Sequence, residues 1–274
     1  MKKSLLFAAL FAGFTSYAMA GELVLASYNT HHSEGEDQVI NPQRIAEVLD
    51  SLDADVIALQ EIDMENGRTH FSDQARSIAY WLSKAENVPW KYENAPAIDF
   101  EEGKYGNALL YRSDKVDLKN FKAIELPGAK DGDGKRSAGI AEFVVDGNKI
   151  QFVTTHFTHK NIDVDGKTLQ IKTFEELNKN LASGLPTFIA ADFNATVDPA
   201  AEHNASTFEA IKKDGWRIDS AVEGQSVPEA PRVIDYIISK NADKFVVKDK
   251  TIIHNKLTDV ASDHYPIKVV YDVK

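Results

Sequence analysis

The sequence predicts a mixed α/β fold, in which a sheet system is covered by helices. Two observations support this prediction. Short apolar segments with the length of buried strands are interspersed with segments of helical apolar spacing. In addition, two strand-like segments are separated by Asp146-Gly147-Asn148, which is typical of a β-hairpin turn. Many strands, some helices and a hairpin together indicate a mixed sheet with helices outside.

The first part of the fold is expected to be strand, helix, strand. Residues 23–28 and 56–59 are apolar runs that end in polar residues, which is typical of buried strands. Between them, Asn41-Pro42 provides a cap and a first-turn proline before helical apolar spacing that reaches Leu52.

The remaining elements follow by the same criteria. Charged or proline-containing loops at residues 99–104, 128–135 and 221–231 are expected at the rim of a site. We expect helices at residues 71–84 and 167–181, and strands at residues 107–111, 140–145, 149–155, 187–190, 233–239, 244–253 and 267–271.

The first 20 residues are typical of a secretory signal peptide. Two lysines precede an apolar stretch at residues 5–14, and small residues follow at 18–20. A membrane anchor is the alternative, but the stretch is shorter than the roughly 20 residues that a span needs. We therefore expect cleavage after Ala20, a periplasmic or secreted protein, and a single catalytic domain at residues 21–274 without a transmembrane segment.

Composition excludes some kinds of chemistry. The chain has no cysteine, so it has neither disulfides nor a thiol nucleophile. Its formal charge of −11 argues against a broad electrostatic grip on nucleic acid, which needs clustered Lys and Arg. A bound metal could still reverse the local charge and admit a phosphate.

Side chains that can bind metal or phosphate follow the predicted strands. Each of them alone is a common cap, turn or core residue. Together they include four carboxylates, two amides and two imidazoles, which favours Mg²⁺ or Mn²⁺ over a zinc–thiolate site. A histidine beside a carboxylate can also serve as a general base. The set comprises Asn29, Glu61, His156, Asp192, Asn194, Asp235, Asp263 and His264.

The order of these motifs resembles the endonuclease/exonuclease/phosphatase superfamily, over nearly the whole of residues 21–274. The resemblance implies a four-layer α/β sandwich, with two mixed sheets packed face to face and helices outside. The motifs are SYN, LQE, YGNALLYRS, TTHF, ADFN, RVIDYI and ASDHYP.

The resemblance also implies roles for the metal-binding residues and for those that handle water. Glu61 would be the principal metal carboxylate, with Asn29 and Asp263 nearby in the metal and phosphate site. Asp192 would orient or deprotonate the attacking water, and Asn194 would help to hold water and phosphate.

Further roles concern the scissile phosphate and the substrate. His264, paired with Asp235, would contact the phosphate and take part in acid–base chemistry, while His156 would contact phosphate or assist the leaving group. Arg136 resembles an arginine that lies just before the predicted hairpin, and this arginine would bind substrate. Arg68 is either a second phosphate contact or a surface side chain.

The implied activity is metal-dependent hydrolysis of a phosphodiester or phosphomonoester by water. The sequence has no lysine-rich DNA-binding insertion, so we expect a small or lipid-derived substrate. We also expect the protein to be a monomer. The stretch from Asn29 through His31 and His32 resembles a bacterial branch of metal-dependent hydrolases, and the two histidines should overlook the cleft. The alternatives are a secreted nuclease that degrades DNA or RNA, and a non-catalytic protein of the same fold that binds a phosphate ligand.

Overall fold

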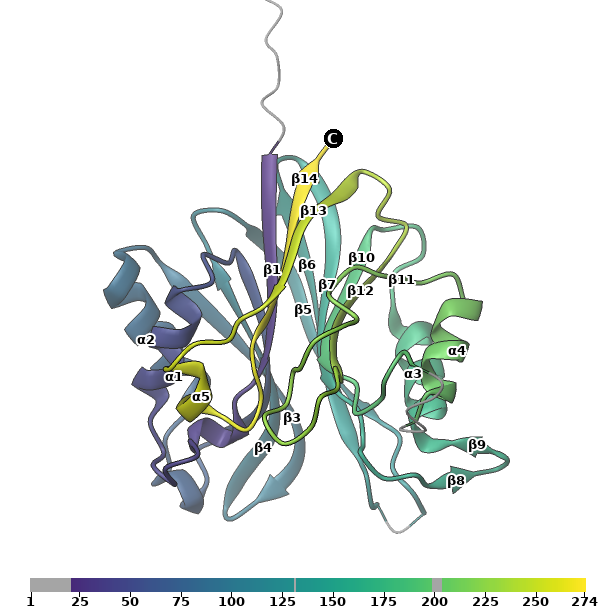
Figure 1. Cartoon of the computed structure of the whole chain (residues 1–274), viewed down its shortest axis with the longest axis horizontal. Helices are drawn as coiled ribbons and strands as arrows, with labels where there is room; N and C mark the ends of the chain where they lie inside the picture. Colours follow the sequence, from purple (N-terminus) through teal and green to yellow (C-terminus); the bar gives the residue numbers. More distant parts are fainter. Residues whose placement is uncertain (1–20, 131, 199–203) are drawn as a thin grey trace, which may run out of the picture.

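The computed structural model describes residues 21–130, 132–198 and 204–274. The predicted signal peptide, residues 1–20, lies outside the described residues. Within them the chain forms two six-stranded sheets and a two-stranded ribbon of β8 (Asp163–Val164) and β9 (Lys167–Thr168). The sheets pack face to face with helices on both outer sides, so the predicted four-layer α/β sandwich is confirmed (Figure 1).

The first sheet is mixed and has the strand order β13-β14-β1-β2-β4-β3. Its central strands β1 and β2 are parallel, and the other neighbours are antiparallel. Its strands are β1 (Gly21–Asn29), β2 (Val56–Met64), β3 (Trp90–Phe100), β4 (Gly103–Arg112), β13 (Phe245–Ile252) and β14 (Ile267–Val273).

The second sheet has the order β11-β12-β10-β7-β6-β5. Here β7 and β10 are parallel, and the other pairs are antiparallel. Its strands are β5 (Asp117–Leu126), β6 (Arg136–Val145), β7 (Asn148–His156), β10 (Thr187–Asp192), β11 (Arg217–Ile218) and β12 (Asp235–Lys240).

Helices cover the outer face of each sheet, as Figure 1 shows. The first sheet carries α1 (Pro42–Asp50), α2 (Gln74–Glu86) and α5 (Thr258–Ala261), and the second carries α3 (Leu169–Asn180) and α4 (Ser206–Lys213). Two short 3₁₀ turns, η1 (His31–Ser33) and η2 (Gly67–Thr69), follow β1 and β2. Among the described residues, no helix is long and apolar enough to cross a membrane.

Three apolar layers hold the sandwich together. Between the sheets, the ring of Phe188 packs at 5.2 Å from both Phe245 and Tyr271, measured between ring centroids. One outer layer buries α1 and α2 against the first sheet, and the other buries Phe174 of α3 and Phe208 of α4 against the second. Burial of apolar area in these layers fixes which face of each strand and helix points into the core.

Local sequence explains where several elements begin. The Asn41 side chain accepts a hydrogen bond from the Arg44 backbone N–H at 3.1 Å, which caps α1. The predicted hairpin turn is confirmed, because Asp146 and Gly147 both have positive φ between paired Val145 and Asn148.

Some predicted boundaries differ from the structure. The helix expected from residue 71 begins at Gln74, because Asp73 accepts from the Arg76 N–H and caps it. The strand expected from residue 233 begins at Asp235, since the Ile234 N–H donates to the Ser226 hydroxyl instead. The loop expected at residues 99–104 is wrong in extent: a two-residue turn joins β3 to β4 there.

Candidate active site

Strand register brings three predicted site residues side by side at one end of the inner strands of the second sheet. Asp192, the last residue of β10, pairs with His156 at the end of parallel β7 and with Asp235 at the start of antiparallel β12. At the corresponding end of the first sheet, Asn29 is the last residue of β1 and pairs with Gln60. Residues 156, 192, 235 and 29 are all buried.

Asn29 links the two sheets at this end. Its amide Nδ2 donates to a Glu61 carboxylate oxygen and to Asp192 Oδ2, both at 3.1 Å, and lies 3.5 Å from His264 Nε2. Its Oδ1 accepts the His31 backbone N–H at 3.1 Å. Asn29 is fully buried. Packing therefore fixes its contact with Asp192, which belongs to the other sheet.

Glu61 reaches this junction through an irregularity in β2. Pairing of β2 with β4 shifts register between Leu59 and Ile62, and Glu61 has a φ of 59°. A bulge of this kind re-aims a side chain, and a non-glycine residue at positive φ is strained. Burial alone would raise the pKa of Glu61, but positive charge on His156, the hydrogen bond from Asn29 and charge on His264 lower it overall.

Asp192 is held by hydrogen bonds and by imidazoles. Its Oδ1 accepts the Asn194 backbone N–H at 2.8 Å, and its Oδ2 lies 3.3 Å from His156 Nε2. Asn194, at a φ of 46°, also places its amide nitrogen 3.0 Å from that histidine nitrogen. Burial opposes ionisation, yet the charge and hydrogen bond of His156, with the charge of His264, hold the pKa of Asp192 well below its usual value.

His264 and Asp235 form a buried pair. Asp235 Oδ2 lies 2.9 Å from His264 Nδ1, which leaves Nε2 directed towards Asp192 Oδ2 at 3.7 Å. Burial alone would lower the pKa of His264, but the charge and hydrogen bond of Asp235, with charge on Asp192 and Asp263, raise it to about 10. Burial raises the pKa of Asp235, and the attraction of His264 opposes that rise.

Two other predicted residues lie around this centre. Asp263 is partly buried and accepts a 3.4 Å hydrogen bond from the Ser262 hydroxyl. Arg136 begins β6 with its Nε buried and without a hydrogen-bond partner, and its charge acts on Tyr105 and His159. Both side chains therefore retain polar capacity for a ligand.

Arg68 lies on the first-sheet side of the site and is held in place. Its Nε and Nη2 donate to the two oxygens of fully buried Asp63 at 2.9 and 2.7 Å. The guanidinium carbon also lies 4.7 Å from the Phe100 ring centroid and 5.6 Å from that of Tyr105. Arg68 is thus neither a free surface side chain nor in hydrogen-bond contact with the other predicted site residues.

Sequence reasoning did not single out Asp63 or Tyr105. They pair across β2 and β4, and burial together with the charge of Glu61 raises the pKa of Tyr105 well above its usual value. Tyr105 is the first residue of the YGNALLYRS motif, and Asp63 follows the LQE motif by two residues. What was missing was the pairing between them, which is a long-range property.

The donor set of the site fits a divalent cation. Among the described residues, neither Glu61 nor Asp263 forms an ion pair with lysine or arginine, so a cation would not have to displace such a side chain. Ligand atoms of Asp192, Asp235 and His264 also lie within 4.8 Å of one another. Carboxylate and amide oxygens are the ligands that Mg²⁺ and Mn²⁺ prefer.

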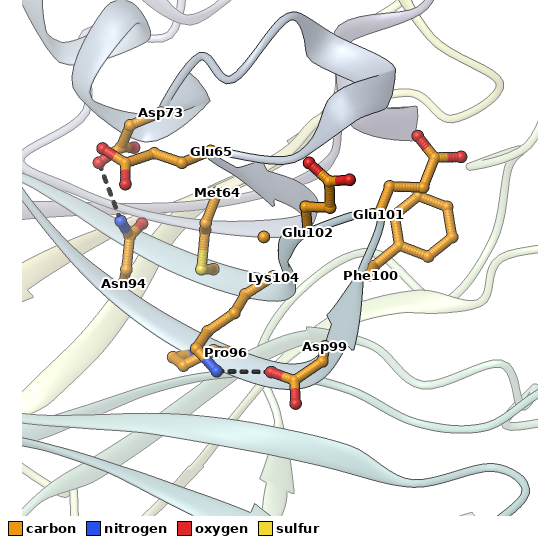
Figure 2. Close-up of a pocket in the computed structure, with 11 residues that line it drawn as sticks. Met64, Glu65, Asp73, Asn94, Pro96, Asp99, Phe100, Glu101, Glu102 and Lys104 are labelled. Atoms are coloured by element: carbon orange, nitrogen blue, oxygen red, sulfur yellow. Dashed lines mark hydrogen bonds and ion pairs between the residues drawn. The ribbon is translucent and has the colours of Figure 1, made fainter.

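A pocket of about 780 Å³ lies beside the site, at the β3–β4 hairpin (Figure 2). In Figure 2 the Asn94 amide donates a hydrogen bond to Asp73, and Lys104 donates one to Asp99. Five carboxylates and a single lysine line it, which makes it unfavourable for a phosphate. None of the predicted site residues lines this pocket.

Comparison with known proteins places the chain in a family. The sequence pattern of the Endonuclease/Exonuclease/phosphatase family matches residues 26–264, which is most of the chain. No curated protein matches the sequence significantly.

Solved structures share the fold at low sequence identity. A family protein from Leptotrichia buccalis has a TM-score of 0.72 at 20% identity, over 92% of this chain and 99% of that one. One from Beutenbergia cavernae has the same TM-score at 19% identity, over 92% and 72%. A mannosyl-6-phosphatase from Bacteroides thetaiotaomicron has a TM-score of 0.63 at 19% identity, over 90% and 98%. With the family pattern matched over most of its length, this chain belongs to the endonuclease/exonuclease/phosphatase family of hydrolases.

Proposed function

We propose that the protein is an exported, divalent-metal-dependent hydrolase in which water attacks a phosphodiester or phosphomonoester. The observation that supports this most is the position of Asp192. It is an ionised, buried carboxylate within hydrogen-bond reach of Asn29 and Asn194, and beside two imidazoles. A carboxylate kept ionised in this way can accept a hydrogen bond from water and orient it for attack.

The imidazoles act on the phosphate. With its pKa raised to about 10, His264 is protonated at neutral pH, and its Nε2–H can donate to a phosphoryl oxygen. Asp235 accepts from Nδ1 of that ring at 2.9 Å, which stabilises the protonated form and fixes the orientation of the ring. His156, on the other side of Asp192, is placed to bind a second phosphoryl oxygen or the leaving group.

Asn29, Glu61 and Asp263 are the residues that would hold the cation. A bound Mg²⁺ or Mn²⁺ would supply charge stabilisation for the phosphoryl oxygens. The protein's own contribution is the arrangement itself: Asn29 joins the two sheets at 3.1 Å from both Glu61 and Asp192, so donors and acceptors need little rearrangement.

We expect a small or lipid-derived substrate rather than nucleic acid, and a monomeric enzyme. The net charge of −11 and the acidic pocket beside the site both oppose a long polyanion. One solved structure of the fold is a mannosyl-6-phosphatase, which is consistent with a phosphomonoester on a small molecule. The N-terminal sequence supports export, and N-terminal sequencing of protein from fractionated cells should find Gly21 first.

The test is hydrolysis by protein comprising residues 21–274. Bis-p-nitrophenyl phosphate, p-nitrophenyl phosphate and plasmid DNA are each incubated with Mg²⁺, Mn²⁺ or EDTA. Glu61→Gln is compared with Glu65→Gln. Glu65 is an exposed glutamate that directly follows β2. We expect cleavage of a small phosphoester that needs metal and Glu61 but not Glu65.

Two outcomes would contradict the proposal. Rapid degradation of plasmid DNA, with small esters left intact, would indicate a secreted nuclease. Binding of metal and phosphate without cleavage of any substrate would indicate a non-catalytic binding protein.

A further inference from the structure

Next to the proposed catalytic centre, the loop after β1 carries two adjacent histidines that the mechanism does not use. A ring nitrogen of His31, one of His32 and a carboxylate oxygen of Glu61 all lie within 4.8 Å of one another. We propose that these three residues form a second metal site, which takes an imidazole-preferring divalent cation such as Zn²⁺ and shares Glu61 with the oxygen-rich site.

The donor geometry is close to what such an ion needs. Tetrahedral zinc with bonds of about 2.0–2.1 Å holds its ligand atoms about 3.3 Å apart. Ligand atoms that already lie within 4.8 Å reach this spacing by small side-chain rotations. The His31 and His32 rings stand edge to face, with centroids 4.4 Å apart and planes at 63°, so two imidazoles converge without stacking.

The hydrogen bonding of His32 is that of a metal ligand without its ion. Nε2 lies 3.2 Å from a Glu34 carboxylate oxygen, while Nδ1 is buried and has no hydrogen-bond partner. The side chain is only 8% exposed, so water does not readily satisfy Nδ1. An unsatisfied buried polar atom is costly, and histidine ligands commonly donate their second N–H to a carboxylate. Glu34 therefore orients His32 and leaves the Nδ1 lone pair for an ion.

The loop is anchored at several points, so its donors are held before an ion arrives. The His31 N–H donates to Asn29 Oδ1 at 3.1 Å, and the Gln74 side-chain amide donates to the His32 carbonyl at 2.5 Å. The Thr30 N–H binds the Gln60 carbonyl at 3.1 Å, which ties the loop to β2 beside Glu61. Preorganisation of this kind reduces the entropy lost on binding.

Local charge also favours a cation. Besides Glu61, the charged groups that act on His32 are Glu34, Asp63 and Arg68. Arg68 is the single positive charge among them and is bound by Asp63 through two hydrogen bonds. On this side of Glu61, three carboxylates therefore face one guanidinium, which favours a cation. The charges of His156, His264 and Asp192 act on Glu61 from the other side. Imidazole donors shift preference from Mg²⁺ and Mn²⁺ towards Zn²⁺.

The experiment measures metal stoichiometry in chelator-treated protein, by equilibrium dialysis with elemental analysis and by calorimetric titration with Zn²⁺. The wild type should bind one more equivalent than His31→Ala/His32→Ala. His254→Ala, which alters an exposed histidine bonded to the Gln225 carbonyl, should bind as the wild type does. Glu34→Gln, which keeps both imidazoles, should weaken that equivalent by about 10–100-fold.

Equal stoichiometry in the wild type and the double variant would overturn the proposal, as would unchanged affinity in Glu34→Gln. Circular dichroism of the metal-free proteins shows whether each variant is folded, and His32→Gln provides a milder replacement if the double variant is not. The readout is independent of catalysis. If no phosphoester is cleaved but the extra equivalent is lost with the histidines, the proposed function fails and this site stands.

Discussion

Replacement of Asp235 by asparagine tests the coupling between the buried carboxylate and His264. The change keeps the shape of the side chain but removes its charge, 2.9 Å from His264 Nδ1. In the wild type the pKa of His264 rises from 6.5 to about 10, which corresponds to about 5 kcal/mol of gross stabilisation of the imidazolium. Burial of Asp235 itself opposes this gain, because burial raises its pKa.

The stability effect should depend on pH in a defined direction. A histidine whose pKa is raised by folding contributes stability that is complete below pH 6.5 and is lost as pH rises through 10. We therefore expect Asp235→Asn to lower the free energy of unfolding by about 3 kcal/mol at pH 6, the lower end for breaking a buried pair. The difference should vanish near pH 10. Urea unfolding at pH 6, 8 and 10 measures it.

Catalysis should fall more steeply than stability. Without Asp235 the buried ring of His264 is largely neutral at pH 7 and its tautomer is no longer fixed, so kcat should drop by about 10²–10⁴-fold. The assays are hydrolysis of the ester that the wild type cleaves and an NMR titration of the His264 ring. Asp55→Asn is the matched control. Asp55 is a buried carboxylate whose pKa is raised by burial, and it directly precedes β2, at the end of that strand away from the site. An unchanged kcat together with a His264 pKa near 10 in Asp235→Asn would refute the reasoning.

The remaining predictions concern Asp192, the metal, Arg68 and the core between the sheets. Asp192→Asn should abolish turnover while circular dichroism stays unchanged; near-wild-type activity would remove Asp192 from its role. EDTA should lower the melting temperature, because a cation that binds the folded state stabilises it, and excess Mg²⁺ should restore it; an EDTA-insensitive melting temperature would contradict a resident ion. Arg68→Lys should raise KM with little change in kcat if Arg68 contacts substrate, because lysine cannot form the two-pronged bond to Asp63; an unchanged KM would leave Arg68 a structural residue. Phe188→Ala should cost about 3–5 kcal/mol in urea unfolding, since its ring fills the space between the sheets; a loss below about 1 kcal/mol would mean that this core collapses around the gap.

Elements with a strong local pattern were predictable, and elements stabilised mainly by their neighbours were not. The buried central strands β1 and β10 and the helix after Asn41 were found from apolar runs and caps. Strands β3 and β5 were missed. Both are edge strands, where alternate or charged residues face solvent and Pro96 in β3 is tolerated, so neither shows an apolar run. Their strand character comes from hydrogen bonds to β4 and β6.

For the site, residue types and their positions after predicted strands were enough to predict the chemistry. Asn29, His156 and Asp192 could be recognised because each directly ends a strand, and the absence of cysteine restricted the site to oxygen and imidazole donors. These are short-range features, since the strand and the group at its end are neighbours in the chain.

How these groups meet depends on contacts between distant parts of the chain. The bulge that turns Glu61 into the junction depends on the pairing of β2 with β4, and the 3.1 Å contact between Asn29 and Asp192 joins residues 163 positions apart. The free Nδ1 of His32 likewise depends on where Glu34 lies in the folded loop. Strand register and sheet packing are set by the sum of many long-range contacts, so no single segment of the sequence contains them.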